Sequence, residues 1–220
     1  MPQRIALLLA LSFGLLGQTA PNSAAKKDTP PPTVKKVTQG PSIKARTPDP
    51  SVKRDEQGAF YVAGYSVRTN NAKEMSGKGE IANLWQRFIE QDLGSAIPNR
   101  TDPTIYVVYS DYDSNEKGDY TYTLGARVYA ADVLPANMTS QSIVPGTYAV
   151  VTTAKGQAGQ VVQAAWKKIW TMTPRQMGGK RAFKTDFEVY GPRATDPRDA
   201  QVDIHIGLAP PPPSPSPAAK

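Results

Sequence analysis

Residues 104–129, with the sequence TIYVVYSDYDSNEKGDYTYTLGARVY, decide the fold of this chain. Thr104–Ser110 and Tyr120–Tyr129 are rich in β-branched and aromatic residues, which favour strands. The stretch between them, Asp111–Asp119, contains the Asp, Asn and Gly residues that are typical of turns. The segment therefore predicts two antiparallel strands joined by a polar hairpin loop.

A strand and a helix precede this hairpin. Phe60–Arg68 (FYVAGYSVR) is rich in strand-forming residues. Glu80–Leu93 carries apolar residues at helical spacing, and Gly94 follows as a stop signal. The apolar face of this helix comprises Ile81, Leu84, Trp85, Phe88 and Leu93. The order up to Tyr129 is therefore strand, helix, strand, strand.

The same order returns in the second half of the chain. The expected elements are a strand over Gln141–Thr153 that is interrupted at Pro145-Gly146, a helix over Gln160–Met172, and strands over Thr185–Tyr190 and Gln201–Leu208. The helix has apolar residues along one face, including Trp166, and Pro174 ends it.

The two halves also align in detail. Val108-Tyr109 matches Val189-Tyr190, and Tyr122–Gly125 matches Ile204–Gly207. A period of about 80 residues is too long for a solenoid repeat and fits a duplicated unit whose two halves share one core. We therefore expect an α+β fold of duplicated βαββ units, in which antiparallel sheets and two helices form a central ligand cleft.

The ends of the chain differ in composition from this middle part. Residues 1–25 are expected to be a signal peptide. Their apolar run, Ile5–Leu16, has the length of a signal-peptide core and is too short to span a membrane as a helix, and Ser23-Ala24-Ala25 provides the small residues of a cleavage site. Residues 26–56 are expected to be a disordered, basic, Pro-rich linker, and residues 210–220 a disordered Pro-rich tail. The folded domain is expected over 57–209, in a chain exported to the periplasm or the extracellular space and without stable membrane insertion.

The net charge of +7 lies mostly outside this expected domain. Residues 26–56 contain eight basic and four acidic residues, whereas residues 57–209 contain sixteen and fifteen. A nearly neutral domain argues against nucleic acid as a partner. The basic linker can make weak contact with an anionic envelope surface, although such runs are more often plain tethers.

The chain has no cysteine and a single histidine, His205. These residues provide no disulfide, no cysteine nucleophile and no ligand set for zinc, so we expect neither a metal nor another cofactor. A serine–histidine pair would have to use His205, which lies in an alternating strand and is expected on its exposed or cleft side. A domain of about 150 residues can bury enough surface to fold without these supports.

One carboxylate and several aromatic residues stand out within the expected strands. Tyr120 and Tyr122 alternate along one strand, and such rings can line a pocket while keeping a polar end. Glu188 lies among apolar neighbours, at the position where the first half has Val107. In a cleft, burial would disfavour its charged form, and a cation held by ring faces would relieve that cost. On spacing alone, a solvent-facing position of Glu188 stays open.

In their order and spacing, several segments resemble the GyrI-like, or SOUL-like, effector-binding superfamily, and most of all its integron-associated effector-binding proteins. The resemblance covers about Phe60 to Leu208. Its segments are LWQRF at 84–88, YTLG at 122–125, IVPGTYAV at 143–150, FEVY at 187–190, and Asp196-Pro197 leading into VDIHI at 202–206. It implies a small-molecule receptor whose ligand lies between two pseudo-symmetric halves, against aromatic side chains.

The resemblance also implies which residues meet the ligand. By position these are Glu188 and Tyr190 of the FEVY strand, the helix residue Trp85, and Tyr122 of the first-half strand. Together with two further strand aromatics, the candidate ligand-binding residues are Glu188, Trp85, Tyr190, Tyr122, Tyr109 and Tyr65. No catalytic residue is assigned.

Three functions follow from these features. The leading hypothesis is an exported protein that holds an amphipathic or cationic organic ligand without turnover. The first alternative is a hydrolase in which Glu188, with a Trp or Tyr of the cleft, activates water. The second is a structural module tethered to the envelope, for which we expect the cleft to be filled by its own side chains.

Overall fold

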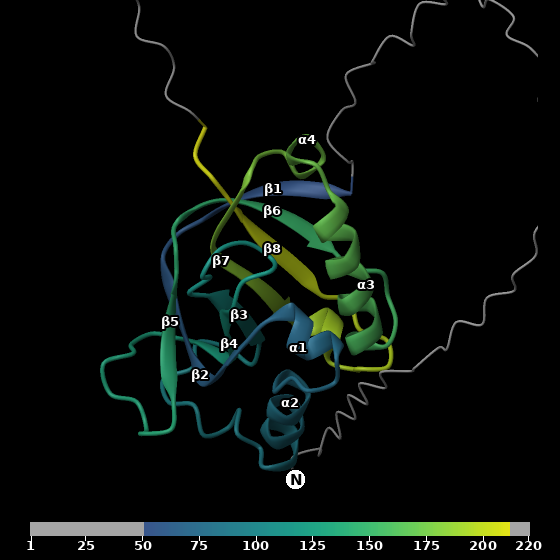
Figure 1. The fold of residues 1–220 in the computed structure, drawn as a ribbon. Helices are drawn as coiled ribbons and strands as arrows, with labels where there is room; N and C mark the ends of the chain where they lie inside the picture. The colour runs from purple at the N-terminus through teal and green to yellow at the C-terminus, as the bar shows by residue number, and fades with distance from the viewer. Residues whose placement is uncertain (1–50, 212–220) are drawn as a thin grey trace, which may run out of the picture.

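The computed structural model describes residues 51–211, which form an α+β fold with one large sheet (Figure 1). The strands are β1 (Val52–Gln57), β2 (Phe60–Thr69), β3 (Ile105–Ser110), β4 (Tyr120–Val128), β5 (Thr139–Ile143), β6 (Gly146–Thr152), β7 (Arg181–Tyr190) and β8 (Asp203–Leu208). The helices are α1 (Asn71–Met75), α2 (Ile81–Glu90), α3 (Ala158–Thr171) and α4 (Pro174–Met177), with a 3₁₀ turn at Pro192–Ala194. The expected α+β class and antiparallel sheet are confirmed.

The eight strands pair in the order β1-β6-β8-β7-β3-β4-β2-β5, and every pairing is antiparallel. The β7–β3 pair lies at the centre, where Glu188 is directly opposite Val107. On either side of this pair the strands of the two halves follow in the same order. A duplicated unit would give this arrangement, and the duplication itself stays a prediction.

The prediction that residues 26–56 form a disordered linker is wrong at its C-terminal end. Val52–Gln57 forms β1, which pairs along its whole length with β6, for example Val52 with Val151. Four consecutive charged residues hide this strand in the sequence, because its order comes from pairing with a neighbour and not from its own apolar residues. The predicted signal segment, residues 26–50 of the linker and residues 212–220 of the tail lie outside the described residues.

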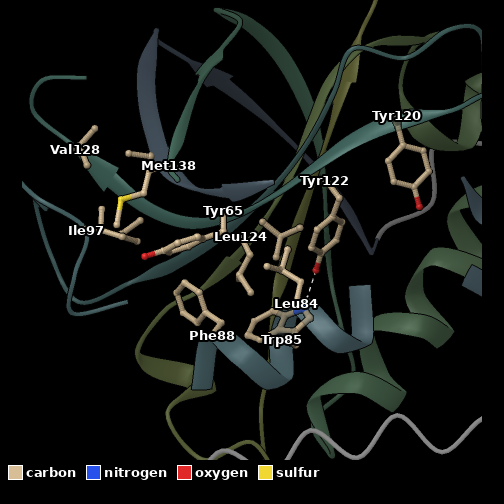
Figure 2. Close-up of a cluster of buried hydrophobic side chains, with 13 residues drawn as sticks. Tyr65, Leu84, Trp85, Phe88, Ile97, Tyr120, Tyr122, Leu124, Val128 and Met138 are labelled. Atoms are coloured by element: carbon tan, nitrogen blue, oxygen red, sulfur yellow. Dashed lines mark hydrogen bonds between the residues drawn. The ribbon is translucent and has the colours of Figure 1, made fainter. Parts of the chain in front are cut away.

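The two long helices match their predictions and cover one face of the sheet. In Figure 2, Leu84, Trp85 and Phe88 of α2 point towards strand residues such as Leu124. α3 contributes a second set of buried residues, Val162, Ala165, Trp166 and Ile169, which pack against β6 and β8. Pro174 follows the end of α3 and is also the first residue of the short α4. A capping box formed by Thr173 and Gln176 caps the N-terminus of α4. Within residues 51–211, no helix is long and apolar enough to cross a membrane.

The opposite face of the sheet is also buried, because the sheet curls. The rings of Phe60 on β2 and Phe187 on β7 are 5.7 Å apart, although β3 and β4 separate these strands. Curling therefore encloses a further apolar cluster, which within residues 51–211 consists of strand residues alone.

His205 belongs to this enclosed face, so the expectation of an exposed or cleft-side histidine is wrong. Its imidazole stacks on the Phe187 ring at 4.3 Å, while the adjacent Ile204 and Ile206 point towards α3. Strand alternation places His205 on the face away from the helices, and the curl of the sheet buries that face. Burial lowers the pKa of His205, against a weaker opposite effect of Asp55.

Two glycines allow β2 and β4 to approach closely. Gly64 and Gly125 lie opposite each other in the register of the two strands. A Cβ atom at Gly64 would lie 2.1 Å from the carbonyl oxygen of Leu124, and one at Gly125 would lie 2.0 Å from that of Ala63. Neither position has room for a side chain, because the obstructing atoms are backbone.

We expect Gly64→Ala or Gly125→Ala to lower the free energy of unfolding by roughly 1–3 kcal/mol or more, since the strands must separate. Urea denaturation monitored by circular dichroism measures this. Gly58→Ala is the matched control, because no atom lies within 4 Å of its Cβ position. Equal stability of the Gly64→Ala and Gly58→Ala proteins would contradict the close approach.

Candidate functional site

A pocket of about 160 Å³ lies between α2 and α3, over the centre of the sheet. One water molecule needs roughly 10–15 Å³ of cavity volume, so the pocket has room for an organic molecule. α1 and the loop between β3 and β4 complete its wall. The lining is rich in aromatic residues, namely Trp85, Tyr109, Tyr112, Tyr120, Tyr122, Trp166, Trp170 and Tyr190, and its charged residues are Glu74, Glu116, Arg181 and Glu188.

Five of the six predicted site residues line this pocket: Glu188, Trp85, Tyr190, Tyr122 and Tyr109. Tyr65 does not. It packs edge-on against Phe88 at 6.3 Å and belongs to the core beneath α2. Figure 2 shows its ring directed away from Tyr122, so the prediction for Tyr65 is corrected: α2 covers it.

Glu188 lies at the floor of the pocket and is 1% exposed. Its Oε1 accepts hydrogen bonds from the Trp166 indole at 2.6 Å and the Tyr109 hydroxyl at 2.7 Å. Its Oε2 accepts one from the Tyr190 hydroxyl at 2.7 Å. Burial raises the pKa of Glu188, and these three hydrogen bonds act in the opposite direction without cancelling the rise.

The aromatic walls of the pocket have a near two-fold arrangement. Trp85 of α2 meets Tyr190 of β7 edge-on at 5.2 Å, and Trp166 of α3 meets Tyr109 of β3 edge-on at 4.9 Å. Each tryptophan thus packs on the tyrosine of the other half. The polar contacts break the symmetry, because the Trp85 indole donates to the Tyr122 hydroxyl at 2.7 Å whereas the Trp166 indole donates to Glu188.

From the sequence, Trp166 is expected only to pack on the apolar face of its helix. The repeat in the sequence did indicate that Trp166 is the counterpart of Trp85 in the second half, because the interval from Trp85 to Trp166 equals the interval from Tyr109 to Tyr190. The contribution of Tyr112 had no such signal. It lies in the loop after β3, and only the folded chain brings its hydroxyl within 2.7 Å of Asp186.

A buried ion pair forms one side of the pocket. Nε and Nη2 of Arg181 donate to Oδ2 of Asp186 at 3.2 and 2.5 Å, and Asp186 is fully buried. Asp186 also accepts from the backbone N–H of Gly207 at 2.8 Å. Burial by itself lowers the pKa of Arg181, but Asp186 and Tyr112 outweigh it and raise the pKa.

Glu74 and Glu116 lie where α1 and the β3–β4 loop line the pocket. The Glu74 carboxylate accepts from the backbone N–H groups of Glu80 and Ile81, at 3.0 and 3.3 Å, and so caps the start of α2. Asn71 joins α1 to the loop by donating to the Glu116 carbonyl at 2.8 Å. Among the described residues, no group of three His, Cys, Asp or Glu side chains is placed to hold a metal ion.

A family model described as "integron-associated effector binding protein" matches residues 55–208. The chain belongs to this family. A relative from Bacillus subtilis (strain 168), YobU, is described as a candidate transcriptional regulator. It is 34% identical to this chain over 147 residues, which are 66% of this chain and 90% of YobU. Residues 55–208, which the family model matches, include every residue that lines the pocket.

Solved structures of similar proteins agree with the fold of this chain. An integron cassette protein from the mobile metagenome of Vibrio cholerae superposes with a TM-score of 0.58 at 29% identity, over 74% of this chain and 98% of that one. The protein SAV2435, solved with tetraphenylphosphonium bound, gives a TM-score of 0.57 at 13% identity, over 72% and 93%. The second likeness concerns the fold alone.

Two matched substitutions test the hydrogen bond to Glu188. Trp166→Phe keeps a ring but removes the donor to a carboxylate, whereas Trp85→Phe removes a donor to a neutral hydroxyl. Above the pKa of Glu188 we expect a loss of roughly 1.5–3 kcal/mol of unfolding free energy for Trp166→Phe and about 1 kcal/mol for Trp85→Phe. In urea denaturation the two losses should converge at low pH, and a constant difference would argue against an ionised Glu188.

The raised pKa of Glu188 predicts a specific pH dependence of stability. The folded protein holds this proton more tightly than the unfolded chain, so stability falls as the pH rises from the usual value of 4.5 through the folded pKa. Glu188→Gln has no such titration and should become more stable relative to the wild type across that window. Unfolding measured from pH 4 to pH 9 checks this, and parallel curves for both proteins would refute it.

Proposed function

We propose that this protein binds an amphipathic organic cation in the pocket, with Glu188 as the counter-ion. One observation carries the proposal: Glu188 is buried in an open aromatic pocket, and its hydrogen-bond donors are all neutral. Within residues 51–211, no Lys, Arg or His forms an ion pair with it.

Burying a carboxylate without a cation is costly, and the three hydrogen bonds offset only part of that cost. A cation bound beside Glu188 would supply the missing charge. The surrounding rings suit such a ligand, because their faces attract cations and their bodies contact apolar groups. Glu74 and Glu116 add further negative charge to the lining, which favours the approach of a cation.

The comparisons support the class of function. Membership of an effector-binding family indicates a small-molecule ligand. The ligand bound to SAV2435, tetraphenylphosphonium, is an aromatic cation of the kind that the present pocket suits on its own chemistry. The described regulator among the relatives suggests sensing as the use of such binding.

The two alternatives from the sequence fit the site less well. A structural module predicts a cleft filled by its own side chains, whereas this pocket is open. A hydrolase needs Glu188 to be free to take a proton from water. Three of the roughly four acceptor positions of its carboxylate are already used by Tyr109, Trp166 and Tyr190.

We further propose that binding takes place outside the cytoplasm, in the periplasm or the extracellular space. The support is the apolar run Ile5–Leu16 with the small residues Ser23-Ala24-Ala25 after it. A chain without cysteine suits an oxidising compartment as well as a reducing one, so composition does not oppose export.

Tetraphenylphosphonium and tetraphenylborate test the role of Glu188, because they have the same shape and opposite charge. Glu188→Gln keeps the shape of the site: its amide oxygen can accept from Tyr109 and Trp166, and its amide nitrogen can donate to a rotated Tyr190 hydroxyl. Calorimetry should show about five- to a hundredfold weaker binding of the cation, the scale of roughly 1–3 kcal/mol for a charge-assisted contact.

Tetraphenylborate should bind the wild type poorly and the Glu188→Gln protein equally or better. Glu90→Gln, on the exposed side of α2, is the matched control and should leave both affinities unchanged. Cation binding that is insensitive to Glu188→Gln would place the charge recognition elsewhere and overturn the proposal.

A further inference from the structure

Arg181 has hydrogen-bonding capacity that the protein does not use. Its Nε and Nη2 serve Asp186 and the Tyr112 hydroxyl, whereas Nη1 donates to no group among the described residues. A guanidinium carries five N–H donors, two of them on Nη1. Two donors on a largely buried side chain, 10% exposed, are therefore left over.

These two donors face accessible space. In the part of the chain that the structure describes, His205 Nδ1 alone is both buried and without a hydrogen-bond partner among side-chain nitrogen and oxygen atoms. Nη1 of Arg181 has no partner, so it cannot be buried in the same sense. Because Arg181 lines the pocket, a bound molecule can reach this nitrogen.

Arg181 and Glu188 are held near each other by one side chain. The Trp166 indole donates to Glu188, and its ring lies 5.4 Å from the Arg181 guanidinium carbon. Phe183 and Tyr112 hold the guanidinium from other sides, at 4.3 and 5.7 Å. The pocket thus presents a fixed acceptor and a fixed donor next to the same indole.

The net charge of the buried groups determines which kind of acceptor can bind Nη1 of Arg181. Arg181 is already neutralised by Asp186, so Glu188 leaves these three groups with one net negative charge, and the other two acidic residues of the lining, Glu74 and Glu116, are only partly buried. A monocation cancels that charge, whereas a zwitterion would leave it uncompensated in a site of low dielectric. The group that meets Nη1 should therefore be a neutral acceptor, such as a carbonyl or ether oxygen.

We infer that the ligand is a monocation that also carries a neutral hydrogen-bond acceptor, with the cation at Glu188 and the acceptor at Nη1 of Arg181. This inference rests on the proposed function and deepens it, because it names a second recognition point in the same pocket. It makes Arg181 a specificity-determining residue.

Three probes separate the contributions. Benzoylcholine is a cation with an ester carbonyl, 4-phenylbutyltrimethylammonium is its analogue without an acceptor, and the same analogue with a carboxylate on the ring is a zwitterion. In calorimetry with the full chain, benzoylcholine should bind about tenfold more tightly than the analogue without an acceptor, the scale of a hydrogen bond from a charged donor. The zwitterion should bind more weakly than benzoylcholine.

Arg181→Lys should bring the ratio of the two cation affinities to about one, because the lysine keeps a charge for Asp186 but lacks the planar fork. If that protein does not fold, Arg181→Met with Asp186→Asn removes both charges together and should give the same ratio. Arg198→Lys is the matched control: Arg198 pairs with Asp196 in a similar way on the surface, and the tenfold ratio should persist.

The outcomes distinguish the inference about Arg181 from the proposed function on which it rests. Equal affinity of both cations for the wild type, with Glu188→Gln weakening both, would overturn this inference and leave the proposed function standing. A tenfold preference that survives the loss of Arg181 would also overturn it. Binding of neither cation would overturn both, and a preference lost only with Arg181 would support both.

Discussion

The burial of the Glu188 carboxylate is the constraint on which the site depends. The central β7–β3 pair brings Glu188 opposite Val107, beneath the two long helices, where water cannot solvate its charge. Trp166, Tyr109 and Tyr190 direct their polar hydrogens to it from three different elements. The aromatic walls are therefore not only apolar surface, because the same rings that line the pocket also stabilise the charge at its floor.

The pocket is nearly symmetric in its packing and asymmetric in its charge. Both halves provide a tryptophan on a helix and a tyrosine on a central strand, and each pair crosses between the halves. On the central strand pair only β7 provides a carboxylate, since Val107 of β3 lies opposite Glu188. The floor of the pocket thus has its buried carboxylate on one of the two halves only.

The buried Arg181–Asp186 pair has a different role from Glu188. Asp186 receives hydrogen bonds from Arg181, Tyr112 and the backbone of Gly207, so its charge is satisfied within the protein. The pair adds no net charge to the pocket but positions a rigid donor there. Removing one partner alone would leave an uncompensated buried charge, which is why the pair must be considered as a unit.

The sequence alone determined the strands and helices with strong periodicity, the α+β class and the family resemblance, because these depend on local pattern and on the repeat. It also predicted six ligand-binding residues; five of them line the pocket, and their role in binding stays a prediction. Only the tertiary structure decided the rest. Charged β1 is ordered by pairing with β6, the curl of the sheet buries His205, and α2 covers Tyr65. The Arg181–Asp186 pair and the contacts of Trp166 likewise follow from where the chain brings distant elements together. Local periodicity shows which face of a helix or strand is apolar. It does not show how the sheet curves or how the helices pack across it, and these determine the contacts of each side chain.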